Sequence, residues 1–274
     1  MDPTSLGDRM KLYEAAEAGR RLMPLLPVIA RIDGRSFSRF TRDMKRPYDE
    51  RMSRLMIDTT RFLVEETCAL IGYTQSDEIS LLWHSSDTKS QVFFDGRVQK
   101  MTSVLAGLST AYFNRALSVR MPEHADALPV FDCRVWNVPT REEAANTFLW
   151  REQDATKNSI SMAARAYYSH EELHGRSGRQ MQALLLEKDV NWNDYPRFFK
   201  RGTFVQRRSI RRAFTAAELD ALPPKHHART EPELEVERSE TVELELPPLG
   251  RVQNRVEVLF EGAHPISGEE PDED

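Results

Sequence analysis

The first 140 residues alternate between short apolar runs and longer amphipathic segments, and this order constrains the fold more than any other feature of the sequence. The run at 26–32 predicts a buried strand, and helical spacing follows over 48–72, with the final glycine expected to end the helix. A hairpin is predicted through 74–78, then a helix over 98–117 and a strand over 129–139. This is the order of the split βαββαβ unit, so we expect an α+β fold in which helices cover one face of an antiparallel sheet.

The rest of the chain has a different pattern. From about Arg141 it is helical and polar, and 240–262 predicts a late β-hairpin. We therefore divide the chain into a first domain at 1–140, a helical and β-hairpin extension at 141–262, and an acidic tail at 263–274 that we expect to be disordered.

The charge of the chain is unevenly distributed, which bears on its partners. The formal net charge is −5, but residues 231–274 hold 14 acids against three arginines, which leaves a net charge of +6 on residues 1–230. A mildly basic body permits a polyanionic partner without proving one. Two cysteines, Cys68 and Cys133, are too few for a disulfide framework. No run approaches 18 apolar residues, and the N-terminus lacks the bases of a signal peptide, so we expect a cytoplasmic protein without a membrane span.

Acidic residues stand at the ends of two predicted strands, and spacing alone leaves two interpretations of them open. Asp33 ends the first strand and Asp77 lies in the hairpin, and both are explained as turn residues because Asp-Gly is a common turn dipeptide. They also suit Mg²⁺, which prefers carboxylate oxygens and promotes phosphoryl transfer in pairs of ions. Side chains alternate along a strand, so Arg31 shares the face of Asp33, and a phosphate would bind there beside the metal ions. In a regular strand, Glu78 falls on the opposite face from Asp77.

The motifs around these acids resemble those of a known family. "RIDGRSFSRFTRDMKRPYDE" followed by "YTQSDEISLLW" is similar to the tRNA(His) guanylyltransferase family and to its bacterial and archaeal relatives, the Thg1-like proteins. "FDCRVW", "LWREQDATKNS" and "FKRGTFV" resemble further family motifs in the same order, so the likeness runs over roughly residues 10–206. The resemblance implies a polymerase-like palm domain at 1–140 and a family-specific region for RNA binding and oligomerisation at 141–262.

The resemblance also implies an enzyme, a Mg²⁺-dependent nucleotidyltransferase that adds nucleotides in the 3′–5′ direction to the 5′ end of tRNA. Members of the family first activate a 5′-monophosphate with ATP, and the 3′-hydroxyl of an incoming GTP then attacks the activated phosphate. We therefore expect two Mg²⁺ ions as cofactors, tRNA and nucleoside triphosphates as partners, and a homotetramer.

Family roles carried to matching positions give the expected site. Asp33, Asp77 and Glu78 are the expected catalytic residues, and Asp33, Asp77 and the Gly34 carbonyl are the expected metal ligands. Arg46, Arg97 and Lys100 are candidate triphosphate contacts, although each also fits ordinary surface. The full set of expected nucleotide contacts is Asp33, Gly34, Arg35, Ser36, Phe37, Ser38, Arg46, Ser76, Asp77, Arg97 and Lys100.

Residues 195–214 form the predicted RNA surface, because they carry seven bases, five aromatic residues and no acid. Basic side chains bind phosphates, and aromatic rings stack on bases. A solvated edge strand with a basic face is the other interpretation that the segment allows. The expected RNA contacts are Asn158, Lys200, Arg201, Arg207, Arg208, Arg211 and Arg212.

Three other functions share some of these sequence features: a zinc peptidase, a tRNA-binding protein without catalytic activity and a nucleotide cyclase. "SHEELHG" matches the zinc-peptidase pattern through His170 and His174, but Ser169 and Glu172 predict that a helix begins at the motif, and Gly175 ends it. A tRNA-binding protein without chemistry would have no need to keep Asp33, Asp77 and Glu78 together. A nucleotide cyclase with a palm domain would share the metal acids but not the Q-S-D-E or W-R-x-x-D motifs.

The choice of RNA depends on one departure from the family pattern. Eukaryotic members that add an untemplated guanosine to tRNA(His) carry His-Ile-Asn-Asn after W-R-x-x-D. Here the same positions read Thr156, Lys157, Asn158 and Ser159, which lose the imidazole and gain a charge suited to phosphate. This resembles the Thg1-like proteins, so we expect template-dependent repair of tRNA 5′ ends, with addition of one guanosine to tRNA(His) as the alternative.

Overall fold

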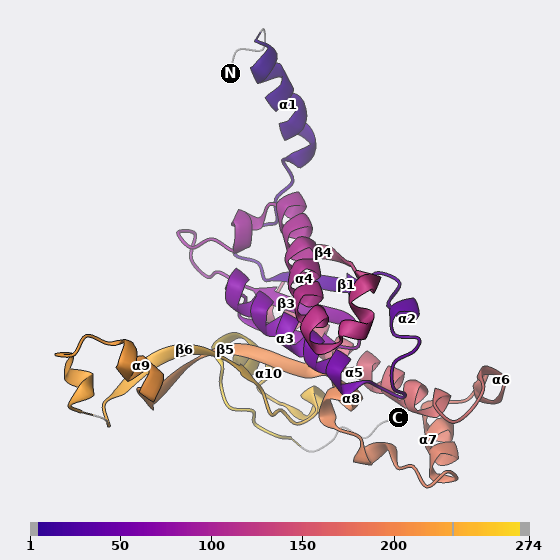
Figure 1. Cartoon of the computed structure of the whole chain (residues 1–274). Coiled ribbons are helices and arrows are strands. Elements are labelled where there is room, and N and C mark those ends of the chain that lie inside the picture. Colours follow the sequence, from indigo (N-terminus) through magenta and orange to yellow (C-terminus); the bar gives the residue numbers. More distant parts are fainter. Residues whose placement is uncertain (1–4, 232, 269–274) are drawn as a thin grey trace.

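A computed structural model describes residues 5–231 and 233–268. Its centre is one six-stranded sheet whose neighbouring strands are all antiparallel, in the order β4-β1-β3-β2-β5-β6 (Figure 1). The strands are β1 (Val28–Gly34), β2 (Ile71–Gln75), β3 (Glu78–Trp83), β4 (Phe131–Asn137), β5 (Thr203–Ala213) and β6 (Glu235–Glu243). The helices are α1 (Leu6–Ala18), α2 (Phe37–Phe40), α3 (Glu50–Thr67), α4 (Val98–Arg120), α5 (Arg141–Arg165), α6 (His170–Leu173), α7 (Gly178–Leu186), α8 (Arg197–Arg201), α9 (Ala216–Ala221) and α10 (Arg255–Glu261).

The first four strands form the unit that the sequence predicts. Their spatial order, β4-β1-β3-β2, is that of a split βαββαβ unit, because β3 lies between β1 and β2. Helices α3 and α4 cover one face, where Leu55, Leu63, Leu105 and Phe113 share a core with the apolar residues of β1 and β3. The expected α+β class and antiparallel sheet are therefore confirmed, and β5 and β6 continue the same sheet beyond residue 140.

Helices also cover part of the other face of the sheet, which the sequence did not predict. Phe148 of α5 and Leu259 of α10 form a second core with Ile29 of β1, Leu82 of β3 and Phe204 of β5. Strand β3 is therefore buried on both faces after its first residue, which explains its almost continuous apolar sequence.

The first long helix ends earlier than the sequence predicts. Helix α3 ends at Thr67, and Cys68 takes the left-handed conformation, with a φ of 54°. Gly72 instead lies inside β2, where an added Cβ would be 2.6 Å from Cγ2 of Thr60 and 2.8 Å from Cγ2 of Val64. The glycine allows β2 to pack closely against α3, so the prediction that it ends the helix is wrong.

The predicted hairpin over 240–262 is also wrong. Its first part belongs to β6, which pairs along its whole length with β5, and two prolines then interrupt the extended backbone. Its second part is α10, in which Val258 and Leu259 are fully buried at adjacent positions. Alternating valines suggested a strand, but this segment instead forms a helix that buries Val258 and Leu259 in a core beside the sheet.

Residues 263–268, the first half of the predicted acidic tail, are held in place by hydrogen bonds. The backbone amide of Ile266 donates to Oδ1 of Asn254 at 2.8 Å, and the amide of Gly268 donates to the carbonyl of Arg251 at 2.8 Å. The prediction of disorder is therefore wrong for this part of the chain. The acidic end at 269–274 lies outside the described residues.

Helix α1 stands away from the rest of the molecule at the N-terminal end (Figure 1). It exposes Leu6, Met10 and Tyr13 to solvent. Within the described residues, no helix combines the length and the apolar character that crossing a bilayer requires.

A buried carboxylate anchors α5 to the chain that precedes α10. The backbone amide of Leu249 donates to Oε2 of Glu152 at 2.6 Å, and the Glu152 side chain is only 6% exposed. Burial raises the pKa of Glu152 to about 7 from an ordinary value of 4.5, although the hydrogen bond from the Leu249 amide and the charges of Arg201 and Arg197 lower it. The folded protein therefore holds a proton that the unfolded chain releases between these two values.

We expect this proton to make the stability of the protein depend on pH. Because the folded pKa is raised, the stabilisation is complete below about pH 4.5 and is lost as the pH rises through about 7, by up to about 3 kcal/mol. Glu152→Gln keeps an acceptor for the Leu249 amide and removes the titration. Urea unfolding should show that the free energy of unfolding of the variant, relative to that of the natural chain, is higher at pH 8 than at pH 5 by up to this amount. If the difference between the two proteins is the same at both pH values, Glu152 is not the group responsible.

Candidate functional site

Two of the predicted catalytic acids, Asp33 and Asp77, meet at one end of the sheet, and we call them the central acids. Asp33 lies one residue before the end of β1, and Asp77 lies in the turn between β2 and β3. The backbone amide of Gly34 donates to the carbonyl of Asp77 at 3.1 Å, which ties the two segments together. Ser76 makes the turn possible in the left-handed conformation, with a φ of 54°.

The register of the sheet adds two acids at the same end. Asp33 is directly opposite Glu78 of β3 on one side and directly opposite Asp132 of β4 on the other. Directly opposed residues share a face, so these three carboxylates form a row across three strands, and like charges placed in this way repel one another. The sequence analysis missed Asp132, because only the pairing of β1 with β4 shows where it lies.

Arginines neutralise the two outer acids of this row. The guanidinium of Arg151 in α5 lies 2.7 Å from Oε2 of Glu78, and that of Arg134 in β4 lies 3.8 Å from Oδ1 of Asp132. Across the described part of the chain, no ion pair reaches either central acid. Within the described residues, the central acids therefore lack the direct ion pairs that the two outer acids have.

The electrostatics of Asp77 show the same imbalance. Its pKa is raised to about 6, mainly by burial and in addition by the nearby charges of Asp33 and Glu78. Hydrogen bonds from its own backbone amide and from the Ser76 hydroxyl, 3.1 Å away, favour the ionised form without offsetting the burial. A cation at this position would stabilise both central acids as carboxylates.

The central acids fit Mg²⁺ by the chemistry of their donors. The ion prefers oxygen ligands, keeps several waters and needs only one or two carboxylates beside substrate phosphates. Among the residues that the structure describes, no three His, Cys, Asp or Glu side chains gather to hold one metal ion, so the protein offers few side-chain ligands here. Gly34 ends β1 beside the central acids, and the role of its carbonyl as a metal ligand stays a prediction.

The loop after β1 separates exposed residues from one buried ring. Arg35, Ser36 and Ser38 are exposed, and Ser36 takes the left-handed conformation, with a φ of 58°. Phe37 is only 3% exposed and packs its ring against three other phenylalanine rings of the core. The predicted nucleotide contact at Phe37 is thus left to its backbone, since its side chain belongs to the core.

Arg97 and Lys100 lie at the other end of the sheet from the central acids. Arg97 immediately precedes α4 and Lys100 lies in its first turn, beyond the far end of β3, and Arg97 forms an isolated bridge with Arg21, which precedes β1. Asp33 lies five residues after Val28 in β1, which rises about 3.3 Å per residue, so about 17 Å of strand separate this end from Asp33. Within one chain these two predicted nucleotide contacts do not reach the site. Arg46 is exposed just before α3.

A hollow beside Ser76 was not predicted. Ser76 lines it together with Ser53 of α3 and Phe198 of α8, and the last two also line an adjoining cavity of about 500 Å³. Three arginines line that cavity, and each is paired with an acid, so it is not a strongly basic site. The arginines are Arg51, Arg54 and Arg120. This cavity could not be predicted from sequence motifs, because segments that are far apart in the chain form its walls.

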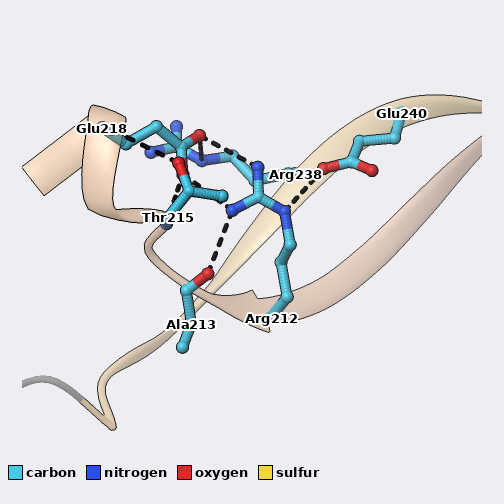
Figure 2. A network of polar contacts seen from close by, with 6 residues as sticks. All are labelled: Arg212, Ala213, Thr215, Glu218, Arg238 and Glu240. Carbon is cyan, nitrogen blue, oxygen red and sulfur yellow. Dashed lines mark hydrogen bonds and ion pairs between the residues drawn. The ribbon is translucent and has the colours of Figure 1, made fainter.

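Strands β5 and β6 form a ribbon that extends beyond the rest of the sheet (Figure 1), and acids of β6 neutralise much of its charge. Arg212 of β5 donates to Glu240 at 2.6 Å and to both carboxylate oxygens of Glu218 at 2.7 and 2.9 Å (Figure 2). Arg238 lies 3.9 Å from the same Glu218 carboxylate. Arg212 therefore joins β5, β6 and α9, and it is not the free cation that the sequence predicted.

The other predicted RNA contacts differ in how free they are. Arg207 and Arg211 are exposed on the ribbon, whereas Arg208 is half-buried and donates to Gln206 at 2.9 Å. The ammonium of Lys200 donates to a backbone carbonyl and lies over a tryptophan ring, so it is also occupied. Arg201 is the last residue of α8 and is half-buried. Asn158 is exposed on α5, where its amide donates to Asp154 at 3.4 Å.

The zinc-peptidase pattern has the local structure that the sequence predicts. Helix α6 begins after Ser169, whose side chain forms a capping box with Glu172, and the helix has only four residues. His174 is already the residue that ends it. The zinc motif requires both histidines within one continuous helix, and this condition is not met here.

Comparisons with known proteins agree on one family. A family model described as tRNAHis guanylyltransferase matches residues 7–139. A solved bacterial tRNA(His) guanylyltransferase-like protein in complex with ATP is 40% identical, covers 74% of this chain and 87% of its own, and superposes with a TM-score of 0.69. Another such structure, in complex with GTP, is 36% identical with a TM-score of 0.63, and covers 74% of this chain and 86% of its own. The tRNA(His) guanylyltransferase of Schizosaccharomyces pombe is 28% identical over 219 residues, which are 73% of this chain and 80% of that protein.

Proposed function

Because the chain belongs to the tRNA(His) guanylyltransferase family of nucleotidyltransferases, we propose that it adds nucleotides in the 3′–5′ direction to the 5′ end of tRNA. The observation that carries the proposal is the pair of central acids, which lie together at the end of the sheet without a cationic partner in the described chain. We further propose that the split βαββαβ unit acts as a polymerase-like palm, since its central strands present these acids at one end.

The site would hold two substrates in sequence. The tRNA 5′-monophosphate is first joined to the adenylyl group of ATP with release of pyrophosphate, and the 3′-hydroxyl of the incoming nucleotide then displaces AMP. The complexes of related proteins with ATP and with GTP support the use of both nucleotides. The exposed loop residues Arg35, Ser36 and Ser38 are placed to contact phosphates next to the central acids.

Asp33, Asp77 and the Gly34 carbonyl would hold Mg²⁺. Two such ions, when bound, stabilise the charge that develops on the attacking and leaving oxygens. The protein itself orients these ligands through the Gly34 hydrogen bond, and keeps Glu78 paired with Arg151 instead of with an ion.

We propose that the exposed arginines of the ribbon, Arg207 and Arg211, contact tRNA phosphates. Their double charge reversal to glutamate should weaken tRNA binding roughly tenfold or more at low salt and reduce its salt dependence, while the affinity for free GTP stays unchanged. Arg212→Gln is the matched control, because its charge is already neutralised by Glu218 and Glu240. Filter binding at several salt concentrations measures these effects. An equal loss of GTP affinity would instead place the arginines at the nucleotide site.

The proposed reaction is template-dependent repair of 5′-truncated tRNAs, and the substitution of Thr156-Lys157 for His-Ile after W-R-x-x-D supports it. Addition of one guanosine to tRNA(His) is the second candidate, because the relative from Schizosaccharomyces pombe carries that name.

We also propose that the protein is cytoplasmic and that it forms a homotetramer. Light scattering tests the homotetramer by measuring the mass of the protein in solution.

One experiment separates the two reactions. The enzyme is offered full-length tRNA(His), 5′-truncated tRNA(His) and an unrelated truncated tRNA, each with one of the four nucleoside triphosphates. Repair predicts incorporation that follows the base opposite the missing position in both truncated tRNAs. Incorporation of guanosine alone, and into tRNA(His) alone, whatever base lies opposite, would exclude templated repair.

A further inference from the structure

We propose that Arg151 is a positioning residue for nucleotide addition, which holds the Glu78 carboxylate away from the metal ions so that the central acids bind them in the productive arrangement. The inference rests on the proposed function of the same site. It concerns a residue of α5 whose ion pairs within the described residues are with Glu78 and Asp154 and not with the central acids.

The geometry around Arg151 fixes its guanidinium group. Its Nη2 atom lies 2.7 Å from Oε2 of Glu78 and 2.8 Å from Oδ2 of Asp154, one turn further along α5. The guanidinium also stacks over the ring of Trp150 at 4.5 Å, and Arg151 is only 8% exposed. A guanidinium held on three sides in this way cannot follow a moving carboxylate, so it determines where Glu78 points.

The position of Glu78 explains why such a partner is needed. Glu78 is directly opposite Asp33 and adjacent in sequence to Asp77, so it lies within reach of an ion bound by the central acids. Without Arg151, the Glu78 carboxylate would lose its ion-pair partner beside two other carboxylates, and an ion bound by the central acids would attract it. A third carboxylate on the ion would bind it more tightly and displace it from its productive position.

The test uses three variants of the full chain. Arg151→Gln removes the charge, and Arg151→Lys keeps a charge that can still reach Glu78. Arg61→Gln is the matched control, because Arg61 forms a comparable ion pair with Glu243, at 2.9 Å, between α3 and β6. Two properties are measured for each protein: the kcat and KM of nucleotide addition to tRNA, and the affinity of the free protein for Mn²⁺ by electron paramagnetic resonance.

We expect opposite changes in the two properties. Arg151→Gln should lower kcat roughly 100-fold with little change in the nucleotide KM, since a small misplacement of reacting groups has an effect of this size. The same variant should bind Mn²⁺ about tenfold more tightly, because the site has lost a nearby positive charge. Arg151→Lys should restore most of both values, and Arg61→Gln should match the natural chain.

A residue that acted only on folding would weaken both properties together. Parallel losses of kcat and Mn²⁺ affinity in Arg151→Gln, without recovery in Arg151→Lys, would overturn the inference, and so would a kcat equal to that of the natural chain. Inactivity of the natural chain on every tRNA would count against the proposed function instead. The Mn²⁺ affinities would still decide whether Arg151 holds Glu78 away from the ion.

Discussion

Replacing Asp33 or Asp77 with asparagine is expected to lower the rate of nucleotide addition to tRNA at least about 1000-fold, because each variant removes a carboxylate that holds the metal ions. The fold should survive, since both residues lie at the end of a strand or in a turn and neither makes an ion pair in the described chain. Asp77→Asn should even relieve repulsion, because burial and two neighbouring charges already disfavour its ionised form.

Asp132→Asn provides the matched control for these variants. Asp132 lies in the same row of acids, directly opposite Asp33, but it is paired with Arg134 and is not one of the central acids. We expect its loss of activity to be at least tenfold smaller than that of the other two variants. Single-turnover assays at saturating Mg²⁺, with circular dichroism to verify folding, measure the comparison. An equal loss in all three variants, or near-normal turnover in Asp33→Asn, would refute the choice of the central acids.

Gly34→Ala is expected to damage both stability and activity. An added Cβ would lie 2.3 Å from the Phe37 ring, and that ring cannot move away because Phe113 and Phe131 pack against it. We expect a loss of about 1–3 kcal/mol in the free energy of unfolding, as for other overpacked sites. Activity should fall roughly 100-fold, because the displaced backbone carries Asp33 with it.

Gly107→Ala separates this effect from the general consequences of replacing a glycine. Gly107 lies in α4 with nothing within 4 Å of the added Cβ, so alanine should stabilise the protein by about 0.5–1 kcal/mol. Its activity should be unchanged. Urea unfolding and tRNA assays on both variants test the pair, and a Gly34→Ala protein as stable and active as Gly107→Ala would contradict the packing that we describe.

The order of the first four strands could be predicted from the sequence because it depends on local patterns. Apolar runs, helical spacing and the turn at Ser76 each occupy a short segment, and the split βαββαβ unit follows from their order. The central acids could be found for the same reason, since Asp33 lies at the end of a strand and Asp77 lies in the turn between two strands. The choice between turn residues and a metal site, however, was decided by the family resemblance and not by spacing.

The partners of these acids could not be predicted, because they depend on register between distant segments. Asp132 is brought opposite Asp33 only by the pairing of β1 with β4, and Arg151 reaches Glu78 only because α5 crosses the other face of the sheet. The W-R-x-x-D motif placed Arg151 and Asp154 one turn apart on a helix, which was the signal available. It did not say which strand they would meet.

The basic segment shows the opposite error. Residues 195–214 contain no acid, so the sequence alone suggested a wholly basic surface. Strand β6 then pairs with β5 and brings Glu237 and Glu240 alongside its arginines. The charge pattern along residues 195–214 therefore overstated the free charge, because Glu218 lies just beyond the segment and Glu237 and Glu240 lie more than twenty residues further on.

The central claim is that this chain extends tRNA at its 5′ end, with the 3′-hydroxyl of the incoming nucleotide as the attacking group. The most direct measurement uses 5′-truncated tRNA whose own 3′ end has been oxidised with periodate, and compares labelled GTP with labelled 3′-deoxy-GTP opposite a cytidine. We predict that GTP is added to the 5′ end of the oxidised tRNA and that 3′-deoxy-GTP is not added, because it lacks the nucleophile. Incorporation of 3′-deoxy-GTP, or loss of GTP addition after oxidation, would contradict the account.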